Sequence, residues 1–553
     1  MSLSNECTIK LHAILAFGGG LNEIPTTAVH GTRMMKLSAR HKDAIGRLLT
    51  SSVAALAMLA SSLVASGQSA NPSDVTSDSI TSEIAGPPIT APASTPPKDP
   101  QAAAKQAEAQ KKQADELKKK VAGAYKDPFY LNDFTYLNDP KYRGNEIGEN
   151  LKGISLGGLG SLDFGGQYRL RYHHEQNMRG AGLTGRDDDF LLDRTRFYFD
   201  HKLNHQIRLF AEFLDAGSTY KDFAPRGIEV NQLDAQNLFA DALVTESAAG
   251  KLSARLGRQE LLFGAQRLLS PLDWANTRRT FEGGRLTWAN EDQTTDLLLV
   301  RPIRINVDRF DSPDQNQVLY GVYNSNKTFV NGPIDTYWLG YEDDLTSKRI
   351  HTVGTLLKGE AGNVLWDNEF GYQFGRNGDG SDASAYSLTF GLGQKIEHCT
   401  KPVLWFYYDW ASGDDSVDNG WNHLFPLGHR YNGFMDLFGR RNLHDINTLL
   451  TFNPTQKLTV LAWYHYFVLA NGNQGPYNLT LSPFNPGGTV GSRDLGHELD
   501  LLGTYKVNRR SDLVLGYSHF FAGNYFVLSQ NAGGNPLFSG DADFFYTQWH
   551  YNF

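Results

Sequence analysis

Residues 162–216, LDFGGQYRLRYHHEQNMRGAGLTGRDDDFLLDRTRFYFDHKLNHQIRLFAEFLDA, contain three strand-like runs joined by one long and one short connection. The long connection covers residues 175–189, whereas the short one is only Leu203-Asn204. A soluble β-sandwich has no reason to lengthen every second loop. A barrel in an outer membrane does, because its periplasmic turns are short and its outer loops are long. The stretch therefore predicts an all-β fold, a transmembrane antiparallel β-barrel.

The same alternation of short and long connections continues to the end of the chain and predicts about 18 strands. An even number of strands places both ends of the barrel on the periplasmic side. The expected strands are residues 162–174, 190–202, 205–216, 235–245, 251–260, 280–290, 293–303, 317–324, 334–342, 347–358, 362–375, 382–396, 401–411, 444–453, 456–468, 493–506, 510–521 and 541–553.

The residue pattern inside these runs also favours a barrel. In QYRLRYH, residues 167–173, tyrosine and leucine occupy one face of a strand while Arg169 and Arg171 occupy the other, because side chains alternate along a strand. The final run, FFYTQWHYNF at 544–553, suits a closing strand with aromatic residues at the membrane interface. Its last residue, Phe553, is similar to the C-terminal signal of bacterial outer-membrane barrels.

Composition agrees with a barrel and argues against other classes of protein. The 553 residues include 12% aromatic residues and 55 glycines, with a mean hydropathy of −0.41. The second half contains no run of eighteen apolar residues, which argues against membrane-spanning helices. The formal net charge of −8 argues against a nucleic-acid-binding protein. Two cysteines are too few for a disulfide framework.

A targeting segment is expected near the N-terminus, but unusually far along the chain. Basic residues within 36–47 precede the apolar run VAALAMLASSLVA, residues 53–65, and small residues follow. This order is typical of a secretory signal peptide. We therefore expect residues 1–70 to comprise an upstream extension and a signal peptide, with the true start at Met34 or Met35. A genuine long leader is the alternative.

Residues 71–160 are expected to link the signal peptide to the barrel, which is expected over 161–553. The Pro-, Ser-, Thr- and Ala-rich residues 71–100 predict disorder. Residues 101–122, QAAAKQAEAQKKQADELKKKVA, contain strong helix formers and no Gly or Pro, so they predict a helix. This helix is either a solvated periplasmic helix or a weak seam for self-association or a periplasmic partner.

Three blocks of sequence resemble the alginate-export family of outer-membrane barrels. They are LGRQELLFGAQR (256–267) continuing to DWANTRRTFEGGRL (273–286), GDDS (413–416) with HLFPLGHRYNGFMDLFG (423–439), and GHELDLL (496–502) with GYSHFFAG (516–523). The resemblance covers most of residues 160–553. It implies a barrel of about 18 strands in the bacterial outer membrane that passes an anionic polysaccharide through a basic lumen.

Arginines on the predicted strands form the candidate substrate pathway. A basic side chain on the lipid face costs about 2–4 kcal/mol at the bilayer midplane, so these arginines should face the lumen or lie at the rim. The guanidinium fork matches carboxylates, and a polyuronate offers one carboxylate per sugar. Alternatively, the arginines pair with lumen carboxylates only to hold the barrel interior together. The predicted pathway residues are Arg169, Arg171, Arg194, Arg196, Arg208, Arg255, Arg285, Arg301 and Glu212.

The arginine-rich block that starts at residue 256 predicts a loop. Gly264 and Pro271 are typical turn residues. A basic loop folded inward would narrow the lumen, whereas the same residues could instead brace a surface loop, and we favour the inward constriction. Its predicted residues are Arg258, Arg267, Trp274, Asn276, Arg278 and Arg279.

Two acidic loops, residues 377–382 and 413–418, are weak calcium candidates. Neither has the full twelve-residue ligand pattern with its terminal Glu, and turn chemistry explains both without metal. The residues concerned are Asp379, Asp382, Asp414, Asp415 and Asp418. No His-Glu-x-x-His motif occurs, and neither catalysis nor a cofactor is predicted.

The resulting prediction is an anion-selective outer-membrane channel, not an enzyme, that passes an alginate-like anionic polysaccharide or a related anionic sugar. The alternative is a general or substrate-specific uptake porin for small anions or sugars. A barrel enzyme acting on lipid or peptide is the weakest reading, and the fold alone does not decide between them. The expected partners are the solute, outer-membrane lipid and, through residues 101–122, either a periplasmic protein or a second copy of the chain, but no nucleic acid.

Overall fold

The computed structural model describes residues 100–144, 146–180, 182–219, 222–415, 419–484, 488–533 and 540–553. The predicted signal peptide, the alternative start residues Met34 and Met35 and most of the Pro-rich linker lie outside the described residues. The chain divides into two compact units, Met1–Gln106 and Ala107–Phe553. Helix α3, Pro100–Ala122, begins in the first unit and matches the helix expected over 101–122. Among the described helices, none is both long and apolar enough to cross a membrane.

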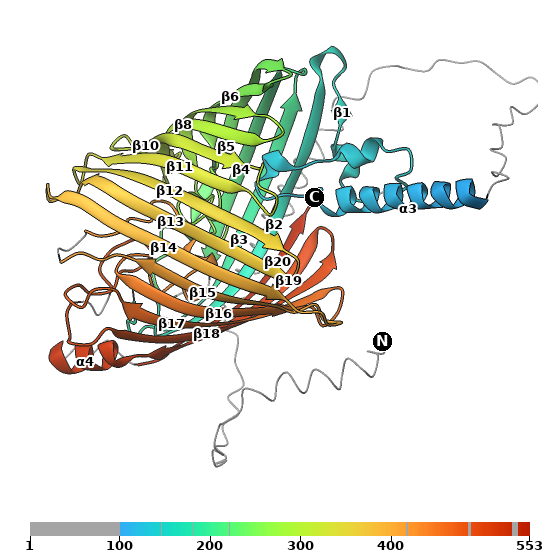
Figure 1. Ribbon diagram of the computed structural model, residues 1–553. Coiled ribbons are helices and arrows are strands. Elements are labelled where there is room, and N and C mark those ends of the chain that lie inside the picture. Colours follow the sequence, from blue (N-terminus) through green and yellow to red (C-terminus); the bar gives the residue numbers. More distant parts are fainter. Residues whose placement is uncertain are drawn as a thin grey trace, which may run out of the picture. The chain divides into compact units, whose positions relative to one another are not determined.

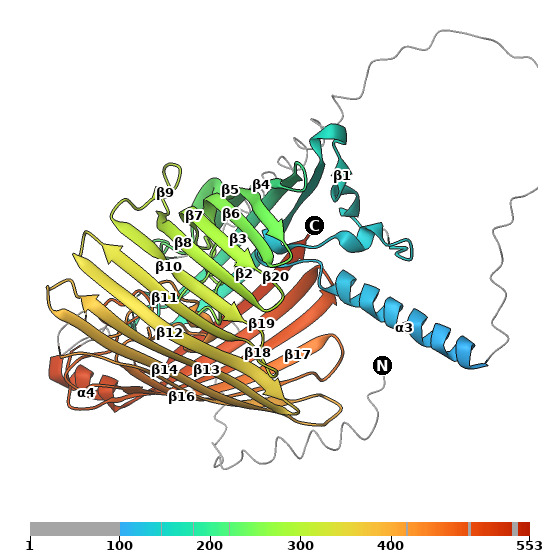
Figure 2. The same cartoon turned by 45° about the horizontal axis from the view of Figure 1, so that its top comes forward.

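Eighteen antiparallel strands of the described residues close into a barrel. Each strand from β2 to β8 and from β10 to β20 pairs with its neighbours in chain order, β8 pairs with β10, and β20 pairs with β2. Figures 1 and 2 show this sheet wrapping around until the last strand lies beside the first long one. The predicted transmembrane β-barrel is confirmed, and each of the eighteen expected strands overlaps one observed strand.

The ends of the barrel strands lie within four residues of the predicted ends. They are β2 Ser161–Gln176, β3 Asp188–Lys202, β4 Ile207–Thr219, β5 Asn231–Ser247, β6 Gly250–Gln259, β7 Phe281–Ala289, β8 Gln293–Arg304, β10 Gln317–Asn326, β11 Ile334–Asp343, β12 Lys348–Ala361, β13 Val364–Arg376, β14 Asp382–Lys395, β15 Val403–Ala411, β16 Leu443–Phe452, β17 Leu458–Leu469, β18 Asp494–Asn508, β19 Ser511–Ala522 and β20 Ala542–Asn552.

Short elements outside the barrel were not predicted. They are β1 Ile154–Ser155, which pairs with β2, β9 Ser312–Pro313, which pairs with β8, helix α4 Asn524–Gly533, and the 3-10 turns η2 Phe129–Leu131, η3 Thr135–Asn138, η4 Glu149–Leu151, η5 Gly157–Leu159 and η6 Gly428–Arg430.

Alternate residues of each strand face the lumen and the outside, as the period of two requires. On β8, Asp296 and Leu298 are buried, while Leu297 and Leu299 are 48% and 61% exposed. In a soluble protein a strand usually buries leucine and exposes its carboxylates. This strand buries a carboxylate and exposes two leucines, as a barrel surrounded by lipid requires. The outer surface is thus apolar and the inner surface polar.

The two ends of the barrel differ in their connections. Turns such as Asn290 to Asp292 join strands at one end, which we call the turn end, and connections of up to 31 residues, 412–442, join them at the other, the loop end. Residues 123–160, the connector, meet the barrel at the turn end. There Arg509, in the turn between β18 and β19, forms ion pairs with Glu146 at 2.9 Å and with Glu149 at 2.5 Å.

Candidate functional site

Four arginines of β2 and β3 form one wall of the lumen. Arg169 and Arg171 alternate with outward residues on β2, and Arg194 and Arg196 do so on β3. Their exposed fractions are only 0–3%. Arg169 and Arg194 are direct cross-strand neighbours, so the two guanidinium groups lie close together. Like charges at this spacing repel each other, and nearby acceptors are needed to hold them.

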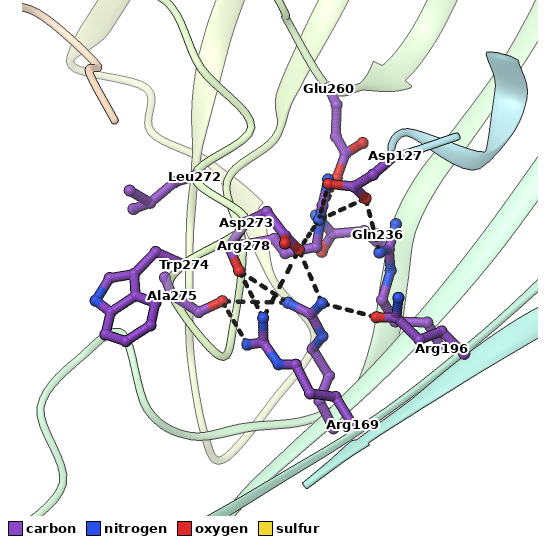
Figure 3. A network of polar contacts seen from close by, with 12 residues as sticks. Asp127, Arg169, Arg196, Gln236, Glu260, Leu272, Asp273, Trp274, Ala275 and Arg278 are labelled. Carbon is purple, nitrogen blue, oxygen red and sulfur yellow. Dashed lines mark hydrogen bonds and ion pairs between the residues drawn. The ribbon is translucent and has the colours of Figure 1, made fainter. Parts of the chain in front are cut away.

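The loop that supplies those acceptors is residues 260–280, which we call the bridge loop. Arg169 donates hydrogen bonds to the backbone oxygens of Asp273 at 2.8 Å and Ala275 at 3.2 Å. Arg171 donates to the Trp274 oxygen at 2.9 Å, and its guanidinium stacks 3.8 Å above the Trp274 ring. Figure 3 shows the loop backbone turned toward the arginines of the wall. The bridge loop therefore lies inside the barrel instead of bracing the outer surface.

The bridge loop also reaches the opposite wall. Arg267 pairs with Asp367 at 3.0 Å and with Glu369 at 3.1 Å, both inward residues of β13. In the closed strand order, β13 is the ninth strand from β3 in either direction around the barrel. Because Arg194 of β3 bonds Asp273 at 2.8 Å, the loop is tied to both ends of one barrel diameter.

A second loop, residues 412–442, also fills the lumen, and we call it the aromatic loop. The His429 ring stacks on the Trp274 ring with centroids 3.5 Å apart. Farther along, the backbone N–H of Met435 donates to Glu498 at 2.9 Å. Gly433, with φ of 82°, permits this approach, since a Cβ there would lie 2.3 Å from a Glu498 oxygen. The two loops therefore contact each other and a wall of β18.

Between the loops and the connector lies a layer of buried ion pairs, the central layer. It contains four arginines and four carboxylates: Arg169, Arg194, Arg196, Arg278, Asp127, Glu212, Glu260 and Asp273. Arg196 donates to Glu212 at 2.7 Å, and both side chains are fully buried. Arg278, whose φ of 58° is unusual for a residue with a Cβ, pairs with Glu260. Figure 3 shows six of these side chains converging, namely Asp127, Arg169, Arg196, Glu260, Asp273 and Arg278.

Cavities lie on both sides of the central layer. At the loop end, a cavity of about 1080 Å³ is lined by residues that include Arg171, Trp274 and His423. At the turn end, a cavity of about 520 Å³ is lined by Arg208, Arg255, Arg285 and residues of the connector. The central layer, the bridge loop and the aromatic loop therefore separate an outer vestibule from an inner one.

Each arginine of the inner vestibule has a close acidic partner. Arg208 pairs with Asp200 at 2.6 Å, Arg255 with Asp241 at 2.7 Å, and Arg285 with Asp296 at 2.7 Å. Their side chains are 14–23% exposed, whereas those of the four central-layer arginines are at most 3% exposed. These guanidinium groups can therefore still meet a solute.

Two sequence-predicted residues do not belong to the lumen. Arg301 shares the outward face of β8 with Leu299, and it donates to the backbone oxygen of Gln317 at 3.2 Å. Arg258 shares the outward face of β6 with Leu256, which is 71% exposed, and it bonds the oxygen of Ala235 at 2.9 Å. The strand alternation therefore turns both side chains outward, near the loop end of their strands.

The remaining constriction residues anchor the bridge loop. Asn276 donates to the backbone oxygens of Asp193 at 2.8 Å and Glu229 at 3.0 Å. Arg279 donates to the Pro426 oxygen of the aromatic loop at 3.1 Å. These contacts make both residues structural ties between the loop and its surroundings.

Two of the calcium candidates accept hydrogen bonds within the protein. Asp379 accepts the backbone N–H of Ser381 at 2.9 Å, and Asp415 accepts an amide N–H of Asn471 at 2.9 Å. Within the described residues, no group of three or more His, Cys, Asp or Glu side chains is arranged for a metal. Asp418 lies outside the described residues, and Asp382 and Asp414 belong to no such group among them.

The connector contributes buried groups that sequence reasoning missed. Lys152 is 6% exposed and lies over the Tyr198 ring, and burial lowers its pKa to about 7. Asp127 joins the central layer from the connector. Nothing in the sequence near Asp127 marks it as a lumen residue, because its partners lie 69 and 151 positions away. Asp273 was overlooked although it lies within the predicted loop.

Comparison with known proteins identifies the type of barrel. A family model described as alginate export matches residues 161–538. No curated protein sequence matches the chain significantly.

Solved structures resemble this barrel at low sequence identity. OccAB1 of Acinetobacter baumannii is 11% identical with a TM-score of 0.50, and the match covers 73% of this chain and 99% of that one. OccAB4 of the same organism is 10% identical with a TM-score of 0.49, covering 70% and 98%. OccD3 of Pseudomonas aeruginosa is 11% identical with a TM-score of 0.46, covering 70% and 91%. The likeness to OccAB1 concerns the fold alone.

Proposed function

The chain belongs to the alginate export family, and from this premise we propose that it passes an anionic, alginate-like polysaccharide or a related anionic sugar through its arginine-lined lumen. The family makes it a channel of the bacterial outer membrane. The turn end then faces the periplasm and the loop end faces the outside. What the solute is, and that it is an anion, are the parts that we propose.

One observation carries the proposal: arginines line the vestibules on both sides of the central layer. Arg171 faces the outer vestibule, and Arg208, Arg255 and Arg285 face the inner one. A guanidinium group remains charged and presents a planar fork to a carboxylate. Each inner arginine has a nearby aspartate, so a passing carboxylate meets a weakened cation. Conduction requires such weak, repeated binding.

A general or substrate-specific uptake porin for small anions or sugars is the second candidate. The same arginines would attract small anions, and the inner and outer vestibules would suit a short solute. The two candidates differ in the length of the molecule that occupies the lumen. A polymer that spans several arginines binds more tightly as it grows longer, whereas a solute of one or two sugars does not.

Single-channel recording of the refolded protein in a planar bilayer tests the proposal. We expect anion-selective current that polyuronate oligomers block, with the half-blocking concentration falling as the oligomer lengthens. Replacing Arg208, Arg255 and Arg285 together with Gln removes three positive charges from the inner vestibule and leaves their aspartates in place. The inner vestibule then turns acidic, and anion selectivity should fall about tenfold or reverse, for a change of about 1.4 kcal/mol or more.

A matched control is Arg304→Gln at the loop end of β8. The Arg304 side chain is 60% exposed and pairs with Asp314, so its loss changes the charge without changing either vestibule. Unselective current in the wild type, indifferent to every oligomer, would reject the proposal. Anion selectivity with block only by short oligomers would favour the uptake porin.

A further inference from the structure

We propose that Arg196 and Arg278 form a binding site for a carboxylate of the translocated solute, and that the chain's own Asp127 occupies this site when the solute is absent. The inference rests on the proposed function and adds a defined subsite to it. The internal ligand belongs to the connector, which meets the barrel from the turn end. Opening the pathway then means exchanging one carboxylate for another.

The geometry at Asp127 is that of a bound carboxylate ligand. One carboxylate oxygen lies 3.0 Å from Nη1 of Arg196 and 2.8 Å from Nη1 of Arg278, and the other lies 3.1 Å from the same Arg278 nitrogen. Both arginine side chains are fully buried, whereas the Asp127 side chain is 37% exposed. The two cations are therefore fixed parts of the lumen, and the anion is the member of the set that water can reach.

The two arginines also keep donors that the protein does not use. Nη2 of Arg196 and Nη2 of Arg278 are buried, and neither has a hydrogen-bond partner among the described residues. A buried donor without an acceptor is costly, and natural structures usually provide one. A carboxylate with its neighbouring hydroxyl groups, as in a uronate, offers more acceptors than the single aspartate does.

The residues after Asp127 extend the resemblance to a sugar acid. The Arg196 guanidinium lies 3.9 Å from the Phe129 ring centre, and Arg255 lies 4.5 Å from that of Tyr130. Arg208 donates a hydrogen bond to the backbone oxygen of Tyr130 at 2.8 Å. The rings of Phe129 and Tyr130 thus place flat apolar faces close to the Asp127 carboxylate. The pyranose ring of a uronate likewise presents an apolar face next to its carboxylate. Residues 127–130 therefore cover three more contacts that a uronate chain would need.

Charge balance explains why an internal ligand is needed. The central layer holds four arginines and four carboxylates. Removing Asp127 leaves one buried cation uncompensated, which is costly in a low-dielectric interior. An entering uronate restores the balance. The exchange therefore avoids an unpaired arginine, while an uncharged sugar cannot make it.

Channel block by a six-residue polyuronate oligomer tests the inference on the full-length protein. Asp127→Asn keeps the size of the side chain and removes the competing charge. We expect the half-blocking concentration of the oligomer to be about tenfold lower for this variant than for the wild type. In the wild type Asp127 occupies the site, and the apparent affinity for the oligomer is reduced by the fraction of time that the site is free. Asp127→Glu restores the charge and should return the value toward that of the wild type.

The matched control is Asp139→Asn in the same connector. The Asp139 carboxylate is solvent-exposed and accepts the backbone N–H of Lys141 at 2.9 Å, so the charge change is the same but the lumen is untouched. We expect no shift for this variant. The half-blocking concentration of neutral maltohexaose should fall no more than twofold in the Asp127→Asn variant. Shifted migration of unheated samples in gel electrophoresis checks that each variant forms a folded barrel.

Two results would overturn the inference while leaving the proposed function intact. One is a wild type that polyuronate blocks and an Asp127→Asn variant with the same half-blocking concentration. The other is an equal fall in half-blocking concentration for maltohexaose and for the polyuronate. That result would make the connector a steric plug without a carboxylate site. Absence of block in the wild type and in every variant would instead reject the proposed function itself.

Discussion

The cationic wall of β2 and β3 and the acidic face of β18 both hold a loop inside the barrel, but they bind opposite ends of the peptide group. Arg169 and Arg171 donate to backbone oxygens of the bridge loop. Glu498 and Asp500 accept backbone N–H groups of the aromatic loop at 2.9 and 3.3 Å. An arginine in a lumen is thus not by itself a substrate site. The candidates are arginines that remain reachable after the loops are bound, such as those of the inner vestibule, and arginines such as Arg196 whose carboxylate partner, Asp127, is partly exposed and could be displaced.

The largest expected effect breaks the cationic wall. Arg196→Gln leaves the fully buried Glu212 without its ion pair, so the free energy of unfolding should fall by about 3–5 kcal/mol. Urea unfolding of the refolded barrel, followed by tryptophan fluorescence, measures the loss.

Glu498→Gln is the matched change on the acidic face. The amide keeps an oxygen for the Met435 N–H, and among the described residues no lysine or arginine loses an ion pair with Glu498. The free energy of unfolding should stay within about 1 kcal/mol of the wild type. Equal losses in both variants would mean that the two walls hold their loops in the same way.

An intermediate effect is expected where the two loops meet. Trp274→Ala removes the stack on His429 and the contact with Arg171, which should weaken loop packing by about 1–2 kcal/mol. Single-channel conductance should rise because the loops separate more often. Trp338→Ala, on the outer face with 38% exposure, is the control and should leave conductance unchanged. A conductance that stays the same in both variants would show that Trp274 does not limit the pore.

The smallest expected effect concerns the connector, whose docking should depend on pH. Burial lowers the pKa of Lys152 to about 7 from an ordinary value of 10.5. Between these values the undocked connector binds more protons than the docked one, so docking strengthens as pH rises. The gain is at most about 1.4 kcal/mol between pH 7 and pH 8.

Hydrogen exchange of connector amides, corrected for the intrinsic pH dependence, measures this effect. Protection should increase from pH 7 to pH 8 in the wild type. Lys152→Met cannot titrate and should show no such increase. A pH dependence that persists in Lys152→Met would assign the effect to another group.

The sequence was sufficient for the barrel because a period of two and alternating connection lengths are local signals. Strand ends and the lumen-facing side of Arg169 and Arg194 followed from them. The outward direction of Arg301 and Arg258 could not be read from the sequence, because both residues lie near the loop end of a strand. Asp127 was missed because its role depends on contacts with residues far away in the chain.

The bridge loop fixes the width of the barrel along one line. It is tied to β3 through Arg194 and to β13 through Arg267, strands that lie opposite each other. A closed sheet of eighteen strands can flatten into an oval under lateral pressure from the membrane. With this loop in place, the barrel resists both widening and narrowing along the diameter that joins β3 and β13. A thick substrate must therefore either deform the barrel wall at right angles to the bridge loop, or first break the ion pairs of Arg267 with β13.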